Sequence, residues 1–319
     1  MNERESLLLE KYQVRKTKDQ KSGFIEFAIK ESERLGYFAE VETAKRGARN
    51  IIVGKPERAK VIFTAHYDTA PKLPLPNFIT PMNIPIYILY QILLTAVILA
   101  PSIILYGVLL GFDAEISSFL GMEEWLYSLL TLLIFYAMLF ITLKMLLVGP
   151  ANKHTANDNT SGVAVLFRIM ELLPEEHRDS VAFVFFDMEE VGLVGSAAFS
   201  KARGGLPSKP VINFDCVSDG DNFVFALKKG ARRYKDALIS AYATEEPKRL
   251  YVLERGVFYP SDQMMFKRGI GVCALKGKEK RLLYLNRIHT GRDVIFLEEN
   301  LDYFAKGSVR LLYILREAE

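Results

Sequence analysis

The sequence is poor in the residues that mark several common classes of protein. It has only two cysteines, Cys216 and Cys273, and no CxxC pair. They can form neither a disulfide framework nor a zinc knuckle, so we expect two buried thiols in a reducing compartment. Lysine and arginine number 41 against 38 aspartates and glutamates, a net charge of +3. A nucleic-acid-binding protein would show a clustered basic excess, so no nucleic-acid partner is expected.

Two long stretches almost lack charge, although charged residues make up 25% of the chain. Residues 84–111 contain no charged side chain, and residues 125–148 contain only Lys144. As helices that rise about 1.5 Å per residue, both would exceed the roughly 30 Å of bilayer hydrocarbon. A soluble core helix is rarely apolar on every face for so long. We therefore predict two transmembrane spans, and a pair of buried core helices is the alternative.

The rest of the chain alternates between short apolar runs and amphipathic stretches. Residues 181–186 (VAFVFF) are typical of a central strand that is buried on both faces. Further strands are expected at 50–54, 61–65, 211–214 and 272–275, and helices at 22–35, 162–173, 232–243 and 297–315. This alternation predicts a layered α/β domain. The apolar runs interrupt it, so we expect residues 1–71 and 151–319 to form one catalytic domain around an inserted hairpin at 72–150.

Histidines and acidic residues follow the expected strands. His66 and Asp68 end one strand, where the carboxylate can orient the imidazole or share its metal. Glu189 and Glu190 follow the apolar run VAFVFF. One of two adjacent glutamates can bind a metal while the other exchanges a proton with water. Two charged residues directly after a fully apolar strand are unlike an ordinary charged surface segment.

Three further motifs carry ligand-type side chains. Asp158 lies in ANDNTSG at the start of an expected helix, where it is either part of an N-cap cluster or a carboxylate that bridges two cations. Asp215 follows the strand VINF, and His289 lies four residues before Asp293. Each motif alone has a structural explanation. Because they all fall at strand ends or at strand-to-helix turns, together they indicate a metal site.

The motifs HYDT, ANDNTSG, DMEEVGLVGS, NFD and IHTGRD occur in an order that resembles the metal-site signature of the M28 family of aminopeptidase-type zinc peptidases. The segment SDQMMF with the following GI also resembles a motif of that family. The resemblance implies a three-layer α/β/α sandwich around a mixed, mostly parallel sheet, here interrupted by a two-helix transmembrane hairpin. It also implies a peptide substrate.

The resemblance implies two zinc ions per chain, and Asp158 would bridge them. His66 and Asp215 would complete one site, and Glu190 and His289 the other. Imidazole and carboxylate ligands without thiolate suit zinc, although this ligand type also admits manganese or cobalt.

Catalytic roles are implied in the same way. Glu189 would be the general base, which takes a proton from the water between the metals and returns it to the leaving amine. Asp68 would orient His66 and so belong to the catalytic machinery, and Asp293 would orient His289. The sequence departs from the family at two positions. Gln263 stands where a histidine is usual, and Ile288 stands where some members have a tyrosine that assists the oxyanion.

Other functions fit parts of this pattern. The same fold serves glutaminyl cyclisation with a single zinc, but retention of all five ligand candidates favours the two-metal hydrolase. A non-catalytic peptide-binding module would have no need of Glu189. An intramembrane metalloprotease would need ligands inside the spans, which contain no histidine, aspartate or glutamate at 84–111 or 125–148, and the chain has no HExxH motif.

The charges around the hairpin predict its orientation. The connection between the two spans carries four acidic residues and no lysine or arginine, while Lys72, Lys144 and Lys153 lie at the other end. By the positive-inside rule the basic end is cytoplasmic, so we expect an integral protein of the cell membrane with a cytoplasmic catalytic domain. The polar start of the chain predicts no cleavable signal peptide. Trp125 and Tyr127 would mark the outer interface. A site so near the bilayer suggests hydrophobic peptide substrates.

Overall fold

The computed structural model describes residues 1–206, 208–244 and 247–317 of the 319-residue chain. The strands are Ala39–Thr43 (β1), Arg49–Gly54 (β2), Val61–His66 (β3), Val181–Phe186 (β4), Val211–Phe214 (β5), Asn222–Leu227 (β6), Arg249–Leu253 (β7) and Gly269–Leu275 (β8). The helices are Glu3–Glu10 (α1), Lys18–Arg34 (α2), Ile84–Gly111 (α3), Asp113–Leu120 (α4), Glu124–Val148 (α5), Gly162–Leu172 (α6), Val194–Ala202 (α7), Lys235–Ala241 (α8) and Glu298–Glu317 (α9).

All eight strands belong to one sheet, in the order β1-β2-β4-β3-β5-β8-β6-β7. The pairs β3–β4, β3–β5, β5–β8 and β6–β7 are parallel, and the other three are antiparallel. This arrangement confirms the mixed, mostly parallel sheet that the sequence predicts.

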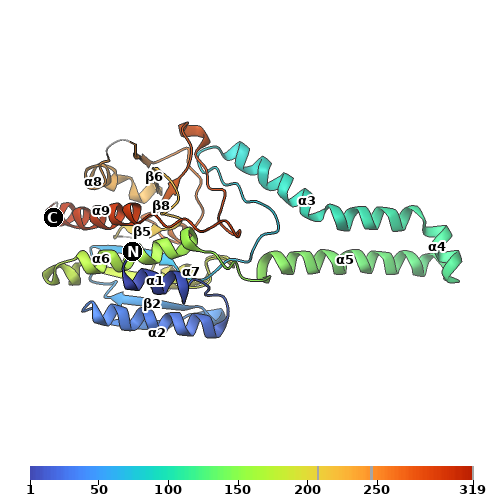
Figure 1. Ribbon diagram of the computed structural model, residues 1–319, viewed down its shortest axis with the longest axis horizontal. Coiled ribbons are helices and arrows are strands. Elements are labelled where there is room, and N and C mark those ends of the chain that lie inside the picture. The colour runs from blue at the N-terminus through green and yellow to red at the C-terminus, as the bar shows by residue number, and fades with distance from the viewer. Residues whose placement is uncertain (207, 245–246, 318–319) are drawn as a thin grey trace.

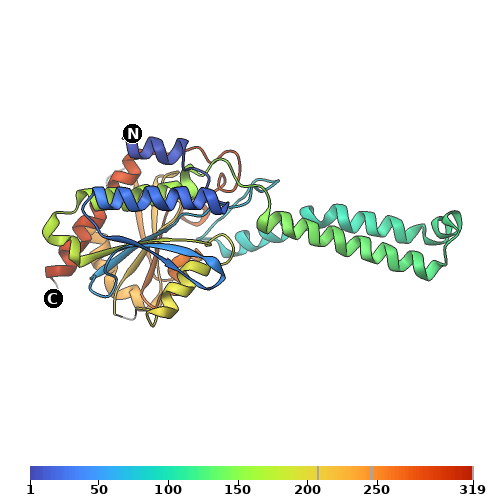
Figure 2. The ribbon, with the colours of Figure 1, turned by 90° about the horizontal axis from the view of Figure 1, so that it is seen from below.

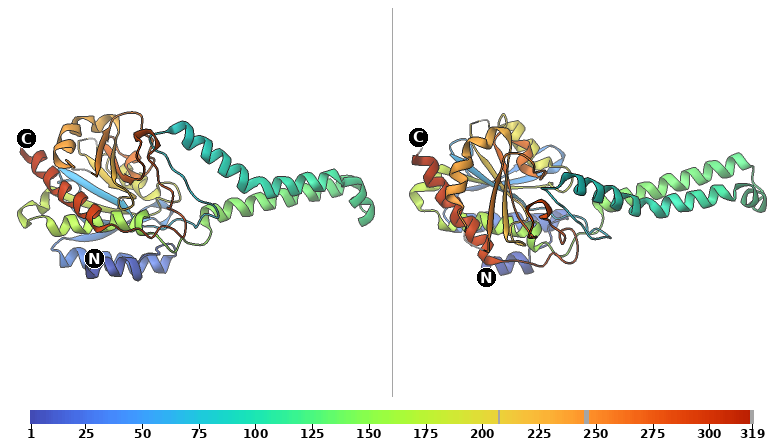
Figure 3. Two further views of the ribbon diagram at one scale, coloured as in Figure 1. Left: turned by 45° about the horizontal axis from the view of Figure 1, so that its top comes forward. Right: turned by 90° about the horizontal axis from the view of Figure 1, so that it is seen from above.

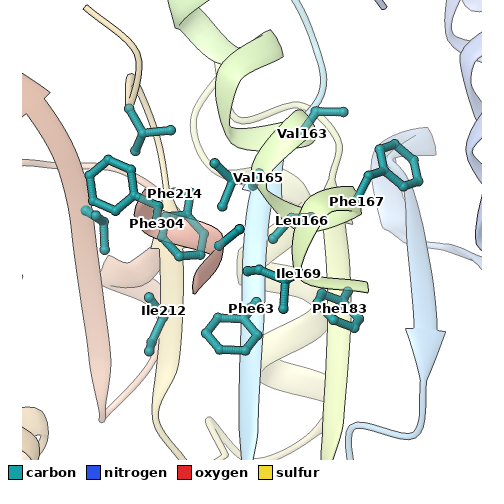
Figure 4. Packing of buried hydrophobic residues seen from close by; sticks show 14 of the residues in the cluster. Phe63, Val163, Val165, Leu166, Phe167, Ile169, Phe183, Ile212, Phe214 and Phe304 are labelled. Carbon is teal, nitrogen blue, oxygen red and sulfur yellow. The ribbon is translucent and has the colours of Figure 1, made fainter. Parts of the chain in front are cut away.

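Helices cover both faces of this sheet (Figures 1 and 2). On one face, Phe63 and Phe183 belong to a core cluster with residues of α2, α6, α8 and α9, part of which is drawn in Figure 4. On the other face, Ile62 and Val184 pack with Phe199 of α7. Since successive residues of a strand point to opposite faces, each central strand contributes to both clusters. The domain is therefore the expected three-layer α/β/α sandwich.

The carboxyl ends of the central strands share one edge of the sheet. β3 runs parallel to β4 and to β5, so the residues that follow these three strands come close together. The hairpin of α3, α4 and α5 extends from the same side of the domain (Figure 1). The topology thus brings the first strand-end motif, the two glutamates and Asp215 to the base of the hairpin.

The hairpin projects away from the catalytic domain (Figures 1 and 3). Its helices α3 and α5 are long and apolar enough to cross a membrane, and only 6% of the most apolar 18-residue window of each is buried. A core helix would be mostly buried, so the alternative of two buried core helices is wrong. The helix bounds match the expected spans within one residue, and the short helix α4 at the tip is an element that the prediction lacks.

Contacts between α3 and α5 hold the hairpin together toward its tip. Tyr127 of α5 is 6% exposed, and its hydroxyl donates a hydrogen bond of 3.2 Å to the carbonyl oxygen of Leu109 in α3. It therefore packs between the two helices, whereas Trp125 is 66% exposed. The rings of Tyr106 and Phe135 also join α3 to α5, with their centroids 4.8 Å apart.

Several other elements differ from the sequence-based expectations. β1 and β7 lie at the two edges of the sheet with largely exposed or half-buried side chains, and both are strands that the prediction lacks. β1 (AEVET) has no apolar run like that of a central strand. β6 (NFVFAL) does carry such a run and is a strand that the prediction lacks. α2 begins four residues early because Thr17 and Gln20 form a capping box at its start. The stretch expected as one helix at 232–243 is a 3-10 turn followed by α8.

Buried ion pairs attach the N-terminal helix α1 to the domain. Glu5 is fully buried, and its Oε1 accepts a hydrogen bond of 2.6 Å from Nε of Arg168 in α6. Arg168 also donates to Asp302 of α9, at 2.5 Å. The neighbouring Arg4 pairs with Glu31 of α2 at 2.9 Å. These contacts connect four helices on one face of the sheet.

We expect Glu5→Ala to destabilise the protein by about 3 kcal/mol, because Arg168 remains buried with one of its partners lost. The unfolding temperature of the purified protein in detergent would fall accordingly. Glu26→Ala is the matched control, since it removes an exposed pair with Lys30 (N–O distance 2.7 Å, both side chains about 70% exposed) and should leave the temperature unchanged. Equal effects of both substitutions would contradict a structural role of the buried pair.

Candidate active site

The structure brings all five predicted metal ligands together at the carboxyl edge of the sheet. His66 is the last residue of β3, and Glu190 and Asp215 follow β4 and β5. Asp158 lies in a short turn (η2, Ala156–Ser161) directly before α6, and its own backbone is non-helical, with φ of −114° and ψ of 96°. His289 lies in the segment between β8 and α9. Segments separated by more than 200 residues in the sequence thus meet at one place.

The carboxylate of Asp158 lies between the two histidines. Its Oδ1 is 3.2 Å from Nε2 of His66, and its Oδ2 is 2.9 Å from Nε2 of His289. His66 Nε2 also lies 3.6 Å from Oδ1 of Asp215, and His289 Nε2 lies 3.4 Å from Oε2 of Glu190. The five side chains therefore form two groups that share Asp158 through its two oxygens.

The donor set fits divalent cations. Ligand atoms of His66, Asp158 and Glu190 lie within 4.8 Å of one another. Within the described part of the chain, two buried oxygens of this cluster, Asp158 Oδ1 and Glu190 Oε1, accept no hydrogen bond. Buried carboxylate oxygens normally have a partner, so these atoms are suited to hold a metal.

The electrostatics of the cluster also favour a cation. Burial, reinforced by the like charge of Asp158, raises the pKa of Glu190 to about 8. Burial also raises the pKa of Glu189 well above its usual range, and Glu190 and Asp262 add to this effect. Burial alone would lower the pKa of His66, but the carboxylates of Asp158, Asp215 and Asp68 outweigh it and raise this pKa. Burial therefore opposes ionisation of these neighbouring carboxyl groups, and bound divalent cations would stabilise their ionised forms.

Asp68 supports both the histidine and the glutamates. Its Oδ1 lies 3.6 Å from Nδ1 of His66, on the side of the ring away from Asp158. The same carboxylate accepts hydrogen bonds from the backbone N–H groups of Glu189 at 2.9 Å and Glu190 at 3.2 Å. The backbone carbonyl oxygen of Asp68, 3.3 Å from Nδ1, is the hydrogen-bond partner of the His66 ring. The Asp68 carboxylate fixes the turn that carries the two glutamates, a contact that the sequence does not reveal.

Asp293 acts on Asp158 rather than on the histidine expected from the sequence. Its carboxylate accepts the backbone N–H groups of Asn157 at 2.8 Å and of Asp158 at 3.0 Å. Among the described residues, no hydrogen bond joins Asp293 to His289. Burial and the nearby Asp158 carboxylate raise the pKa of Asp293 to about 8.

The segment around Asp158 is shaped by its neighbouring amides. Asn159 Nδ2 donates to the carbonyl of Phe214 at 2.9 Å, and its Oδ1 accepts the N–H of Gly162 at 3.1 Å. A Cβ on Gly162 would lie 2.3 Å from the carbonyl oxygen of Phe214, so only glycine fits there. Asp158 is not part of a capping arrangement, because the N-cap of α6 is Ser161 and makes no side-chain cap. The N-cap interpretation of Asp158 is therefore wrong.

Cys216 lies closer to the site than strand alternation suggests. β5 ends at Phe214, and Cys216 has a left-handed backbone with φ of 58°, so the alternating pattern no longer holds there. Its thiol donates to Oδ1 of Asp215 at 3.2 Å, and its Sγ groups with ligand atoms of Asp158 and Asp215. Burial raises the pKa of this thiol well above its usual value, so the group remains a thiol.

A pocket of about 200 Å³ opens onto these residues, and it includes two residues from the start of the hairpin that sequence reasoning missed. Ile79 and Tyr87 line it together with Glu189 and His289. Tyr259 also lines it, but its hydroxyl donates to the carbonyl of Asp215 at 3.0 Å. In the sequence, an aromatic residue near the end of an apolar span indicates only a position at the membrane interface. No sequence signal therefore marked Tyr87 as a residue that lines the active-site pocket.

The two departures from the family pattern occupy different places. Ile288 lines the pocket, where it offers no hydrogen bond to an oxyanion. Gln263 lies in a short 3-10 turn (η5, Asp262–Met265), where its Nε2 donates to the carbonyl of Tyr259 at 2.5 Å and its Oε1 accepts from Asn213 at 3.2 Å. Gln263 therefore supports the wall of the pocket from behind.

An α/β/α sandwich with a cluster of histidines and carboxylates at its carboxyl edge is the arrangement of a metal-dependent hydrolase. The chain belongs to peptidase family M28, whose profile matches residues 143–305, about half of the sequence. The match covers four of the five ligand candidates, and His66 lies outside it. Membership supports a metallopeptidase-like hydrolase and zinc as its metal.

Solved structures share the fold at low sequence identity. The LapA aminopeptidase of Legionella pneumophila is 15% identical with a TM-score of 0.56, and the alignment covers 99% of this chain and 70% of that one. The glutaminyl cyclase of Porphyromonas gingivalis is 16% identical with a TM-score of 0.57, covering 98% and 96%. The glutaminyl cyclase of Bacteroides thetaiotaomicron is 14% identical with a TM-score of 0.54, covering 97% and 96%. No curated protein sequence matches the chain.

We expect Asp158→Ala to lose most of the bound zinc, because it removes the carboxylate that faces both histidines. Elemental analysis of the purified protein would show a lower zinc content per chain than in the wild type. Asp221→Ala, which removes an exposed carboxylate outside the site, is the control and should retain the metal. Undiminished zinc in the Asp158 variant would contradict the shared role of this residue.

Proposed function

We propose that this protein is a membrane-anchored di-zinc aminopeptidase that hydrolyses peptide bonds near the N-termini of peptides. The observation that carries the proposal is the position of Asp158, whose two oxygens face two different histidines, each with a further carboxylate nearby. One metal would need only one of these groups. The pair of groups suits two cations held by His66 with Asp215 and by His289 with Glu190.

The chemistry divides between the metals and the protein. When bound, two zinc ions would polarise the carbonyl of the scissile amide and acidify the attacking water. Glu189 lines the pocket beside the proposed ligands. Its carboxylate would accept the proton as the water oxygen bonds to the carbonyl carbon, and would return it to the amine nitrogen as the C–N bond breaks. Asp68 holds the backbone of Glu189 in place for both transfers.

Glutaminyl cyclisation is the second candidate, because two of the structural relatives are glutaminyl cyclases. That reaction releases ammonia from an N-terminal glutamine and adds no water, so mass spectrometry of the products distinguishes it from hydrolysis. The sharing of Asp158 by two groups favours the two-metal hydrolase. One zinc per chain in fully active protein would favour the cyclase.

We further propose that α3 and α5 span the cell membrane, with the catalytic domain in the cytoplasm. Lys72 and Lys153, both exposed, lie at the end of the hairpin next to the domain. Asp113, Glu115 and Glu123 lie at its tip, around α4. This distribution supports a cytoplasmic domain by the positive-inside rule.

We expect Glu189→Gln to keep its zinc and its unfolding temperature but to lose turnover about 100-fold or more, because the amide cannot take the proton of the attacking water. The rate would be followed by mass spectrometry on a library of peptides with free N-termini, with N-acetylated peptides as the test of exopeptidase action. Glu175→Gln changes an exposed glutamate and serves as the control. A Glu189 variant with near wild-type turnover would rule out this general base.

The orientation can be tested by cysteine labelling in intact cells. Ser118 in α4 and Ser208 in the domain are both exposed, whereas Cys216 and Cys273 are buried. We expect Ser118→Cys to react with a membrane-impermeant thiol reagent and Ser208→Cys to react only after the cells are opened. The reverse result would place the catalytic domain outside the cell. Equal labelling in intact cells with no protein in the membrane fraction would contradict the spans.

A further inference from the structure

A second cavity, of about 350 Å³, lies between α3 and α5 where they meet the domain. We call it the interhelical cavity; its walls include Leu94, Ile98 and Leu99 of α3 and Leu143 and Leu146 of α5. The segment that connects β3 to α3 closes it on the side of the domain. It has the size of a small-ligand site.

The interhelical cavity adjoins the pocket of the active site. Ile79, Tyr87 and His289 line both. His289 is one of the proposed metal ligands, so a molecule in the interhelical cavity would lie beside the pocket in which the amide would be hydrolysed. The hairpin therefore supplies one wall of a cavity that borders the candidate metal site.

The bend of α3 accounts for this space. Pro101 lies inside the helix, where it removes a backbone hydrogen bond and kinks the chain. α3 is bent, and its end next to the domain stands away from α5 (Figures 1 and 3). The contacts of Leu109 with Tyr127 and of Tyr106 with Phe135 lie beyond Pro101, toward the tip. The helices thus pack at the tip and separate at the base.

One face of α3 is directed at the cavity. Tyr87, Gln91, Leu94 and Ile98 follow one another at intervals of four, three and four residues, which is the spacing of a single helix face. Leu93, on a neighbouring face, is 58% exposed and does not line the cavity. Residues that line the cavity and residues that are exposed thus lie next to each other on α3. Leu94 and Leu93 are such a pair, so the same substitution can be made inside the cavity and outside it.

The chemistry of the walls distinguishes a peptide from a plain hydrocarbon chain. Most of the lining is aliphatic, but Asn77, Gln91 and Thr95 add amide and hydroxyl groups. Within the described part of the chain, the side chain of Gln91 makes no hydrogen bond. Polar side chains inside a membrane segment are expected to face a functional interior. An acyl chain has no groups to pair with them, whereas the backbone of a peptide has both donors and acceptors.

We propose that the interhelical cavity binds a hydrophobic peptide that enters from the lipid phase, with its apolar side chains against the leucines of α3 and α5 and its backbone against Gln91 and Thr95. The proposal rests on the proposed peptidase function and names its substrate class: peptides that partition into the bilayer. Ile79 and Tyr87 then guide the peptide from the cavity to the amide-cleaving site.

Two fluorescent peptides test this inference with the full chain reconstituted in phosphatidylcholine vesicles. Both have the same free N-terminal residues and the same soluble tail; one carries a short run of leucines between them and the other carries serines. Binding is measured by fluorescence anisotropy on the Glu189→Gln protein, and kcat/KM on the otherwise unmodified protein. Laurate serves as a competitor that contains a hydrocarbon chain without peptide groups.

We expect Leu94→Trp, which fills the interhelical cavity, to lower the preference for the leucine peptide over the serine peptide by about tenfold or more, in binding and in kcat/KM. Leu93→Trp places the same side chain on the exposed face of the same helix and should keep the wild-type preference. Gln91→Leu keeps the cavity apolar and of similar volume, and it should weaken the leucine peptide while laurate competes better. Zinc content and unfolding temperature report whether each variant is folded.

The outcomes test the binding role of the interhelical cavity independently of the proposed peptidase activity. If the wild type hydrolyses neither peptide, the proposed function fails, while the binding preference still decides the role of the cavity. A preference that survives both Leu94→Trp and Gln91→Leu in folded protein would overturn the inference. Laurate that competes with the leucine peptide equally well in the wild type and in Gln91→Leu would assign the cavity to an acyl chain and also overturn it.

Discussion

The position of Asp158 is the constraint on which the site depends. Its two oxygens lie 3.2 Å from His66 and 2.9 Å from His289, and these histidines come from parts of the chain 223 residues apart. A carboxylate can face two partners at once only if its backbone is held firmly. The N–H groups of Asn157 and Asp158 donate to Asp293, and Asn159 binds the end of β5 through the carbonyl of Phe214. These hydrogen bonds fix the backbone on both sides of the Asp158 carboxylate.

The other acidic residues serve this arrangement through backbone contacts as well as through charge. Asp68 lies behind His66 and also accepts the N–H groups of both glutamates, so one carboxylate positions a proposed ligand and the proposed base. Each of these carboxylates is costly to bury, and burial raises the pKa of Glu189 and Glu190. Bound cations would offset the cost of burying these carboxylates close together. The same reasoning explains why the carboxylates gather at one edge of an otherwise apolar sheet.

The hairpin and the α/β domain meet at the candidate active site. The chain leaves the domain just beyond Asp68 and returns just before Asp158, so the insertion begins and ends at the site. Ile79 and Tyr87 reach the pocket from this connection, and the bend of α3 at Pro101 leaves room for a second cavity beside it. An apolar pair of helices is usually described as an anchor. Here two residues of the insertion, Ile79 and Tyr87, also line the pocket of the candidate active site.

The sequence by itself determined the features that depend on local pattern. Length and hydropathy located both apolar helices within one residue, and apolar runs located the central strands β4 and β5 with their ends. Ligand-type residues at those ends, with their resemblance to peptidase family M28, identified the five residues that meet. Edge strands such as β1 had no such run. Tertiary structure alone decided that Cys216 turns toward Asp215, that Asp293 holds Asp158, and that Tyr87 lines the pocket. These facts follow from backbone angles and from contacts between distant segments, which no local pattern encodes.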